Sequence, residues 1–255
     1  MRGYDGASYG DGMADVYDEW YPEPTDTDLC VAALADLAGD GPVLELGAGT
    51  GRLALPLARL GLEVHALDGS ERMIERLTAK ATDTHLTTFV ADMGGPLPAG
   101  PYSLVFVAVN TFFSLVDDGA QQATMGRVAQ SLEHGGRFVV EAFVPESTDG
   151  GDHVDVRDLT ADRVVLSISR TDPAAQRASG QFVEFRDGEP VRLRPWAIRW
   201  ATPEQLDALA RAAGFELEHR WGGWDRRPFG PESISHVSVY RRLDGPLHQL
   251  GPQRT

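Results

Sequence analysis

The sequence is poor in residues that crosslink a chain or hold a metal ion. Cys30 is its single cysteine, which excludes an internal disulfide and a zinc site built on cysteines. Because Cys30 falls in an apolar helical pattern from Leu29 to Leu37, we expect it to be a small buried side chain. The seven histidines lack the i, i+4 pairing of a helical metal site. We therefore expect no bound metal.

Positive charge is also scarce. The chain has 23 Lys+Arg against 38 Asp+Glu, a formal net charge of -15. Nucleic-acid phosphates require a basic face, so this balance opposes a role on DNA or RNA. An acidic surface can steer a cationic substrate, although its plainer effect is solubility.

Long apolar runs are missing as well. No charged-then-apolar leader opens the sequence, and no stretch approaches the roughly 20 apolar residues of a membrane span. We therefore expect a cytoplasmic protein without a membrane partner. With 255 residues, of which 42% are hydrophobic, the chain can bury one large core, and we expect one domain with an insertion.

Glycine, in contrast, is concentrated in one informative segment. The apolar strand 43–46 carries Glu45 near its end and runs into Gly47-Ala48-Gly49-Thr50-Gly51-Arg52, which opens a helix. Glycines at alternate positions allow tight turns and close approach of a ligand, since no Cβ intrudes. The dinucleotide fingerprint needs a glycine where this chain has Arg52, so a pyrophosphate coenzyme is disfavoured.

Acidic and polar residues follow the next strands. Asp68 ends the predicted strand 63–67, at the offset where a carboxylate binds ribose hydroxyls in doubly wound folds. Asp92 and Met93 follow the predicted strand 87–91. The run 103–109 is rich in Val and Phe, which is typical of a strand buried on both faces, and it ends at Asn110.

The order of elements predicts a parallel sheet. Helices are expected at 27–38, 51–60, 70–81 and 118–132, between strands 43–46, 63–67, 87–91, 103–109 and 137–141. Ligands of such sheets bind beyond the carboxyl ends of the strands, where Glu45, Asp68, Asp92, Asn110 and Glu141 all fall.

The pattern changes after Glu141. Polar and apolar residues alternate in segments 153–158, 163–171, 180–186 and 191–200, with turns at Asp172-Pro173 and Asp187-Gly188. This pattern predicts a small antiparallel sheet, inserted over the site at about 152–200. A helix then starts at Thr202-Pro203, and strands 215–221 and 234–242 complete the main sheet. We expect residues 1–26 to form a lid with a short helix at 14–20, residues 27–243 to form the main domain, and residues 244–255 to be a disordered tail.

These landmarks resemble the class I S-adenosylmethionine-dependent methyltransferases. The likeness implies an α/β fold, a doubly wound and mostly parallel seven-stranded sheet, with S-adenosylmethionine as cofactor. It implies that Asp92 accepts a hydrogen bond from the adenine amine and that Met93 lends its backbone N–H. The full set of cofactor-binding residues that it implies is Tyr17, Glu45, Gly47, Ala48, Gly49, Gly51, Arg52, Asp68, Gly69, Ser70, Met73, Asp92, Met93, Val109 and Asn110.

A narrower likeness concerns the acceptor. The segments Ala14 to Tyr21 and Val139 to Glu141, with Pro145-Glu146, are similar to bacterial sugar-amine N-methyltransferases of antibiotic pathways, which also carry an antiparallel insertion. This implies that Tyr17 closes over the cofactor and that Tyr21 and Glu141, the candidate catalytic residues, face the acceptor. The chain departs from that group after its fourth strand, where Ser114 and Leu115 stand in place of His or Tyr.

Aromatic side chains are expected around the mouth of the site, where they suit an amine or a rigid ring. The candidate substrate-binding residues are Trp20, Phe112, Phe113, Phe143 and Trp196. Arg199, Arg226 and Arg227 could hold an acidic group but are more typical of surface charges.

The reaction expected is methyl transfer to an amine nitrogen of a small natural product, such as an amino sugar, amino acid or peptide amine. An amine attacks unaided, whereas a hydroxyl needs a base. Glu141 is a better candidate for binding a cationic amine or taking its proton than His134, His219 or His236. O-methylation, an S-adenosylmethionine-binding enzyme that transfers no methyl, and a nicotinamide-dependent reductase stay open as alternatives. The protein could act as a monomer or a homodimer.

Overall fold

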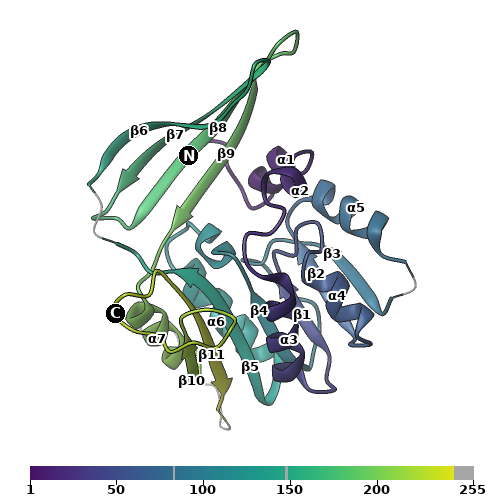
Figure 1. Cartoon of the computed structure of the whole chain (residues 1–255). Coiled ribbons are helices and arrows are strands. Elements are labelled where there is room, and N and C mark those ends of the chain that lie inside the picture. The colour runs from purple at the N-terminus through teal and green to yellow at the C-terminus, as the bar shows by residue number, and fades with distance from the viewer. Residues whose placement is uncertain (83, 147–148, 244–255) are drawn as a thin grey trace.

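A computed structural model describes residues 1–82, 84–146 and 149–243, so the expected disordered tail at 244–255 lies outside the described residues. The core is a seven-stranded sheet with the order β10-β11-β5-β4-β1-β2-β3 (Figure 1). Strands β1 to β5 are parallel, β11 is antiparallel to β5, and β10 is antiparallel to β11. The bounds are β1 Val43–Leu46, β2 Val64–Asp68, β3 Leu86–Val90, β4 Tyr102–Val107, β5 Leu132–Phe143, β10 Phe215–Trp221 and β11 Ser235–Arg242. The predicted doubly wound, mostly parallel sheet is confirmed.

Helices cover both faces of this sheet (Figure 1). Side chains of α3 (Thr27–Ala38), α4 (Ala54–Arg59) and α5 (Glu71–Lys80) join one hydrophobic cluster with the sheet. Side chains of α6 (Ala120–Ser131), α7 (Pro203–Ala212) and the 3-10 helix η1 (Thr111–Ser114) join the other cluster. Cys30 is fully buried in the first cluster, as its apolar surroundings predict.

Polar side chains set where three of these helices begin. Asp26 accepts a hydrogen bond from the Leu29 N–H at 3.0 Å and caps α3. Ser70 caps α5 in the same way, through the Met73 N–H at 3.2 Å. Thr202 begins α7 with a complete capping box and a proline in the first turn. Each cap satisfies a backbone N–H that has no partner inside its helix.

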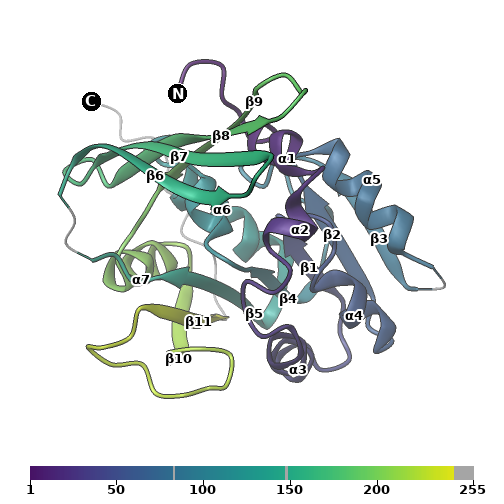
Figure 2. The ribbon, with the colours of Figure 1, turned by 45° about the horizontal axis from the view of Figure 1, so that its top comes forward.

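The inserted sheet is also confirmed. It comprises β6 Gly151–Leu159, β7 Arg163–Asp172, β8 Arg177–Arg186 and β9 Arg192–Arg199, paired antiparallel in that order. Figures 1 and 2 show this sheet standing apart from the central one, with α1 (Ser8–Met13) beside it. A small hydrophobic cluster that includes Met13, Val165 and Phe182 joins α1 to the inner face of the inserted sheet.

Several predicted bounds are wrong. In place of one helix at 14–20 the chain forms α1 and then α2 (Tyr17–Trp20), because Asp15 in the link between them binds two arginines of β9. The helix expected from residue 51 begins only at Ala54, since Gly51 has a φ of +89°. The strand expected at 137–141 is longer at both ends, since β5 runs from Leu132 to Phe143.

None of the helices in the described parts of the chain is both long enough and apolar enough to cross a membrane.

Candidate active site

The glycine turn lies at the carboxyl end of β1, next to the end of β2. The N–H groups of Gly47 and Ala48 both donate to the carbonyl of Leu67, at 2.8 and 2.9 Å. Gly47 and Gly49 have φ values of +71° and +55°, in the region that favours glycine. A Cβ on Gly47 would lie 2.3 Å from Cγ2 of Thr111, so the turn also packs too closely for any other residue.

Asp68 joins this turn to α5. One carboxylate oxygen accepts from the Gly49 N–H at 2.8 Å and the other from the Ser70 N–H at 2.9 Å. Burial raises the pKa of Asp68, and the two backbone N–H groups oppose that rise. Each carboxylate oxygen accepts one of these bonds and keeps capacity for a further donor, as a ribose diol would need.

Glu45 and Arg52 place opposite charges beside the turn. Glu45 is 4% exposed, and its Oε2 has no hydrogen-bond partner among the residues described. Burial raises the pKa of Glu45 to about 8, although the nearby Arg52 opposes the rise. Arg52 is held by Thr27, whose Oγ1 accepts from its Nη1 at 3.1 Å. A buried carboxyl with a free oxygen, close to a guanidinium, fits a ligand that carries an ammonium and a carboxylate.

The ends of β4 and β5 are tied together by Glu141 and Asn110. Oε2 of Glu141 accepts from the Val109 N–H at 2.8 Å, and Oδ1 of Asn110 accepts from the Phe143 N–H at 2.6 Å. Val109 and Asn110 have φ values of +50° and +64°, so β4 ends at Val107, two residues earlier than expected. Burial raises the pKa of Glu141. Its carboxylate therefore holds the strained backbone at the end of β4.

Asp92 and Met93 follow β3. Asp92 is exposed and accepts from the Gly94 N–H at 2.7 Å, while Met93 is buried in the core. The N-terminal segment passes close by, since a Cβ on Gly6 would lie 2.8 Å from Oδ2 of Asp92. It also passes Gly69, where a Cβ would lie 2.6 Å from the carbonyl oxygen of Gly6. The N-terminal segment therefore covers the ends of β2 and β3.

A group of tyrosines from the N-terminal segment reaches the glycine turn through Tyr17. Cε1 of Tyr17 lies 3.8 Å from where a Cβ of Gly49 would be, and the Tyr17 and Tyr21 rings are 5.2 Å apart. Burial raises the pKa of Tyr17 to about 12. Tyr9 interacts electrostatically with Tyr17 and Tyr21, and burial raises the pKa of Tyr9 well above its usual value. Sequence reasoning missed Tyr9 because it precedes the recognisable Ala14 to Tyr21 segment.

Ser70, the residue that caps α5, also contacts the N-terminal segment. Oγ of Ser70 donates to Asp11 at 2.6 Å, which ties α1 to the start of α5. Met73 is 2% exposed and packs in the cluster of Met13 and Val165. Met73 thus supports the N-terminal helices, and its predicted contact with the cofactor stays a prediction.

The predicted substrate-binding aromatics divide into two groups. Trp20 and Trp196 both lie near Phe182 of β8, with ring centroids at 5.9 and 6.3 Å. Phe112 and Phe113 have no exposed surface and pack in the core, where Phe113 is 5.1 Å from the ring of Phe143. The structure brings the first group together beside Tyr21 and leaves the second in the core, so a substrate role for Phe112, Phe113 and Phe143 stays a prediction.

The other candidate bases and arginines have partners or lie elsewhere. His134 lies at the start of β5, His219 stacks on Trp221, and His236 is fully buried with Nδ1 2.8 Å from Oγ of Ser238. Burial lowers the pKa of His236 to about 4, which makes it a weak base. Arg199, Arg226 and Arg227 pair with Asp118, Asp36 and Asp225.

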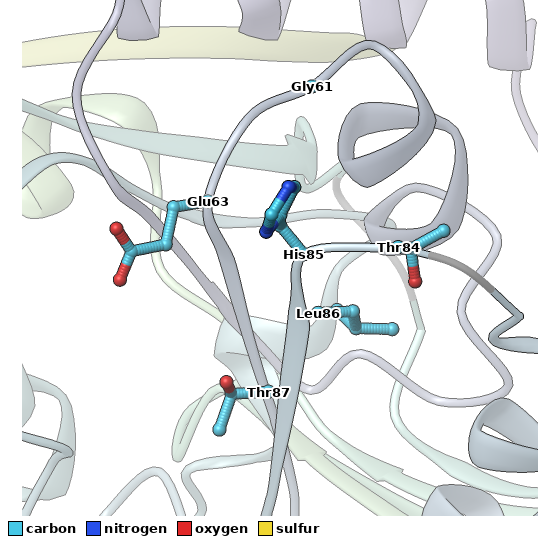
Figure 3. Close-up of a pocket in the computed structure, with 6 residues that line it drawn as sticks. All are labelled: Gly61, Glu63, Thr84, His85, Leu86 and Thr87. Atoms are coloured by element: carbon cyan, nitrogen blue, oxygen red, sulfur yellow. The ribbon is translucent and has the colours of Figure 1, made fainter.

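A hollow of about 470 Å³ lies at the opposite edge of the sheet, by the amino ends of β2 and β3 (Figure 3). Its lining residues are Gly61, Glu63, Thr84, His85, Leu86 and Thr87. Because ligands of parallel sheets bind at the carboxyl ends, this hollow is a poor candidate for the active site.

Known proteins match both the sequence and the fold. A family model described as a methyltransferase domain matches residues 43–136, which contain the glycine turn, Asp68 and Asp92. The chain is 27% identical over 203 residues to the cypemycin N-terminal methyltransferase of a Streptomyces species, covering 78% of this chain and 82% of that protein. It is also similar to the solved structure of the CcbJ methyltransferase from Streptomyces caelestis, with 38% identity, a TM-score of 0.87, and coverage of 94% of this chain and 100% of that one.

A third match shows the fold alone. The S-adenosylmethionine-bound structure of CalS10, an amino pentose methyltransferase from Micromonospora echinaspora, has 22% identity, a TM-score of 0.59, and coverage of 93% of each chain. The central sheet, the glycine turn and the likeness to CcbJ over nearly the whole chain agree. The chain belongs to the class I S-adenosylmethionine-dependent methyltransferases, and S-adenosylmethionine is its cofactor.

Proposed function

We propose that this enzyme methylates an amine nitrogen of a small natural product. The observation that carries the proposal is the group formed by Tyr9, Tyr17 and Tyr21, in which Tyr17 lies against Gly49 of the glycine turn and interacts with the other two. When an amine is methylated, positive charge develops on nitrogen, and aromatic faces stabilise that charge. With a pKa of about 12, the Tyr17 phenol stays protonated at neutral pH and does not serve as a base for a hydroxyl acceptor. The relatives named as N-terminal and amino pentose methyltransferases agree with an amine acceptor.

The residues beside the turn fit the cofactor in charge and in shape. Glu45, with its unpartnered buried Oε2, would hold the ammonium of the amino-acid end, and Arg52 would hold the carboxylate. Asp68 would bind the ribose hydroxyls, with Gly69 and Ser70 supporting it, and Asp92 and Met93 would hold the adenine. Gly47, Ala48, Gly49 and Gly51 would pass close beneath the ligand.

The cofactor supplies an electrophilic methyl group when bound, so the protein's main tasks are alignment and exclusion of water. Tyr17 and the N-terminal segment would cover the reacting atoms. Glu141 would act by fixing Val109 and Asn110 rather than by taking a proton, since one of its oxygens already accepts from the Val109 N–H. Tyr21 would face the acceptor from the end of α2.

The acceptor class can be tested with paired compounds. The enzyme is incubated with S-adenosylmethionine and glucosamine, phenylalanine or trialanine, and with the N-acetyl form of each, which keeps every hydroxyl and loses the basic amine. Mass spectrometry measures S-adenosylhomocysteine and the methylated product. We expect product only from free amines, and a methyl group found on oxygen would contradict the proposal.

Replacing Gly49 with alanine should separate backbone strain from loss of cofactor contact. Gly119 also has a positive φ, of +76°, in the left-handed region, with nothing within 4 Å of a built Cβ, so Gly119→Ala is the matched control. Each change should cost about 1 kcal/mol of unfolding free energy. Only Gly49→Ala should also weaken S-adenosylmethionine binding, by about tenfold. Denaturant unfolding and calorimetric titration measure the two effects, and equal cofactor affinity in both variants would refute the role of the turn.

Cofactor affinity should depend on pH through Glu45. With a pKa of about 8 in the free protein, the carboxyl is mostly protonated at neutral pH. A cofactor ammonium favours the ionised carboxylate, so binding releases a proton, and affinity should rise by about tenfold from about pH 6 to pH 8. Calorimetry in two buffers of different ionisation enthalpy measures the released proton. Glu45→Gln should abolish both effects, and wild-type affinity that is flat over this range would argue against the contact.

A further inference from the structure

Arg157 lies among aromatic rings on the inner face of the inserted sheet. Its guanidinium carbon is 5.1 Å from the ring centroid of Trp20, 4.8 Å from that of Tyr21 and 4.8 Å from that of Phe182. The register of β6 shifts between Val156 and Asp158, so Arg157 is the extra residue of a bulge. Bulges re-aim side chains, and here the bulged residue faces the N-terminal segment.

Arg157 is unlike the other arginines near this face. Arg163 pairs with Asp158 and Glu19, while Arg192 and Arg194 pair with Asp15. Arg157 is exposed, and within the described part of the chain it forms no hydrogen bond or ion pair; it contacts the three rings and interacts electrostatically with Tyr9. Its N–H donors are therefore open to a ligand. They have no carboxylate partner in the described residues, although the chain has 38 Asp+Glu against 23 Lys+Arg.

The position of Arg157 connects it to the cofactor turn. Tyr17 covers Gly49, its ring is 5.2 Å from that of Tyr21, and Tyr21 in turn lies under the guanidinium of Arg157. An acceptor whose amine is at the glycine turn therefore has Arg157 on the far side of Tyr21. Three rings fix the guanidinium in place, and its planar fork matches a carboxylate in bidentate geometry.

We propose that Arg157 binds a carboxylate of the acceptor, so that the substrate carries both an amine and an acid. This deepens the proposed function, on which the amine part of the inference rests. It favours an amino acid or a peptide with a free carboxylate over a neutral amino sugar. Trp20, Tyr21 and Phe182 form the walls of the same subsite.

The test uses binding, so it does not require the natural acceptor. The enzyme loaded with S-adenosylhomocysteine is titrated by calorimetry with hippurate, which pairs an aromatic ring with a carboxylate, and with hippuramide, its neutral amide. Neither compound has a basic amine to methylate. The wild-type protein should bind hippurate at least about tenfold more tightly than hippuramide. Arg157→Gln should abolish this preference, and Arg157→Lys should retain part of it.

Arg170→Gln is the matched control. Arg170 lies on β7 of the same sheet. Ser167 of β7 is paired with Phe182 and so shares its face, whereas Arg170, three residues further along, faces the opposite side and pairs with Asp152. Arg170→Gln should leave the preference for hippurate unchanged, and thermal denaturation checks that all variants fold.

Equal binding of both compounds by the wild type, or a preference for hippurate that survives in Arg157→Gln, would overturn the inference. If free amines are methylated but hippurate is not preferred, only this inference fails, whereas hippurate preference without any amine methylation refutes the proposed function alone.

Discussion

Replacing Arg194 with alanine should lower the free energy of unfolding by about 3–5 kcal/mol. Arg194 is 2% exposed, and its guanidinium binds Asp15 at 2.5 Å and Glu184, which is 3% exposed, at 2.7 Å. It also donates to the carbonyl of Gly12 and lies over the ring of Trp20. The variant leaves Glu184 buried with the weaker support of Arg186, and leaves the exposed Arg192 as the partner on β9 of Asp15, in the link between α1 and α2. Denaturant unfolding measures the loss.

Arg192→Ala tests whether burial is the cause. Arg192 sits on the same strand and binds the same Asp15 at 2.7 Å, but its side chain is 52% exposed. Exposed pairs contribute about 0–1 kcal/mol, so this variant should be nearly as stable as the wild type. Equal losses in the two variants would show that the buried ion pairs do not dock the N-terminal segment.

Asp68→Ala should weaken S-adenosylmethionine binding by about 1–3 kcal/mol, or about 5- to 150-fold. The change removes the acceptor of the Gly49 and Ser70 N–H groups together with the proposed ribose contact. Asp68→Asn, which keeps one of the two acceptor oxygens, should lose less. Calorimetric titration gives the three affinities.

The control for Asp68 is Asp40→Ala. Asp40 is an exposed carboxylate that follows α3, so its removal changes the net charge of the protein equally. Cofactor affinity should not change. An Asp68→Ala protein that binds as tightly as the wild type would remove the ribose assignment.

The sequence was sufficient to predict the central sheet and its ligand-binding edge, for a physical reason. Parallel strands read as short apolar runs, and their carboxyl ends meet at one edge, so Glu45, Asp68 and Glu141 could be grouped without coordinates. The glycine turn carries its own backbone requirement, which Gly47 and Gly49 satisfy with positive φ. The presence of an inserted antiparallel sheet followed from the alternation of polar and apolar residues and from the turn at Asp187-Gly188.

Features that depend on contacts between distant segments could not be predicted. Local pattern gave no sign that Asp15 would bind Arg194, which is why the first helix was misplaced. The burial of Phe112 and Phe113 depends on how η1 packs against β5, which no local pattern specifies. The direction of Arg157 depends on a bulge, which leaves no mark in an alternating strand.

The most direct test of this account is a crystal structure of the enzyme with S-adenosylhomocysteine. We predict that the amino-acid end of the ligand lies between Glu45 and Arg52, that Asp68 binds both ribose hydroxyls, and that Tyr17 covers the ligand. Clear density for the ligand elsewhere, such as the hollow by Glu63 and His85, with no ligand against the glycine turn, would contradict it.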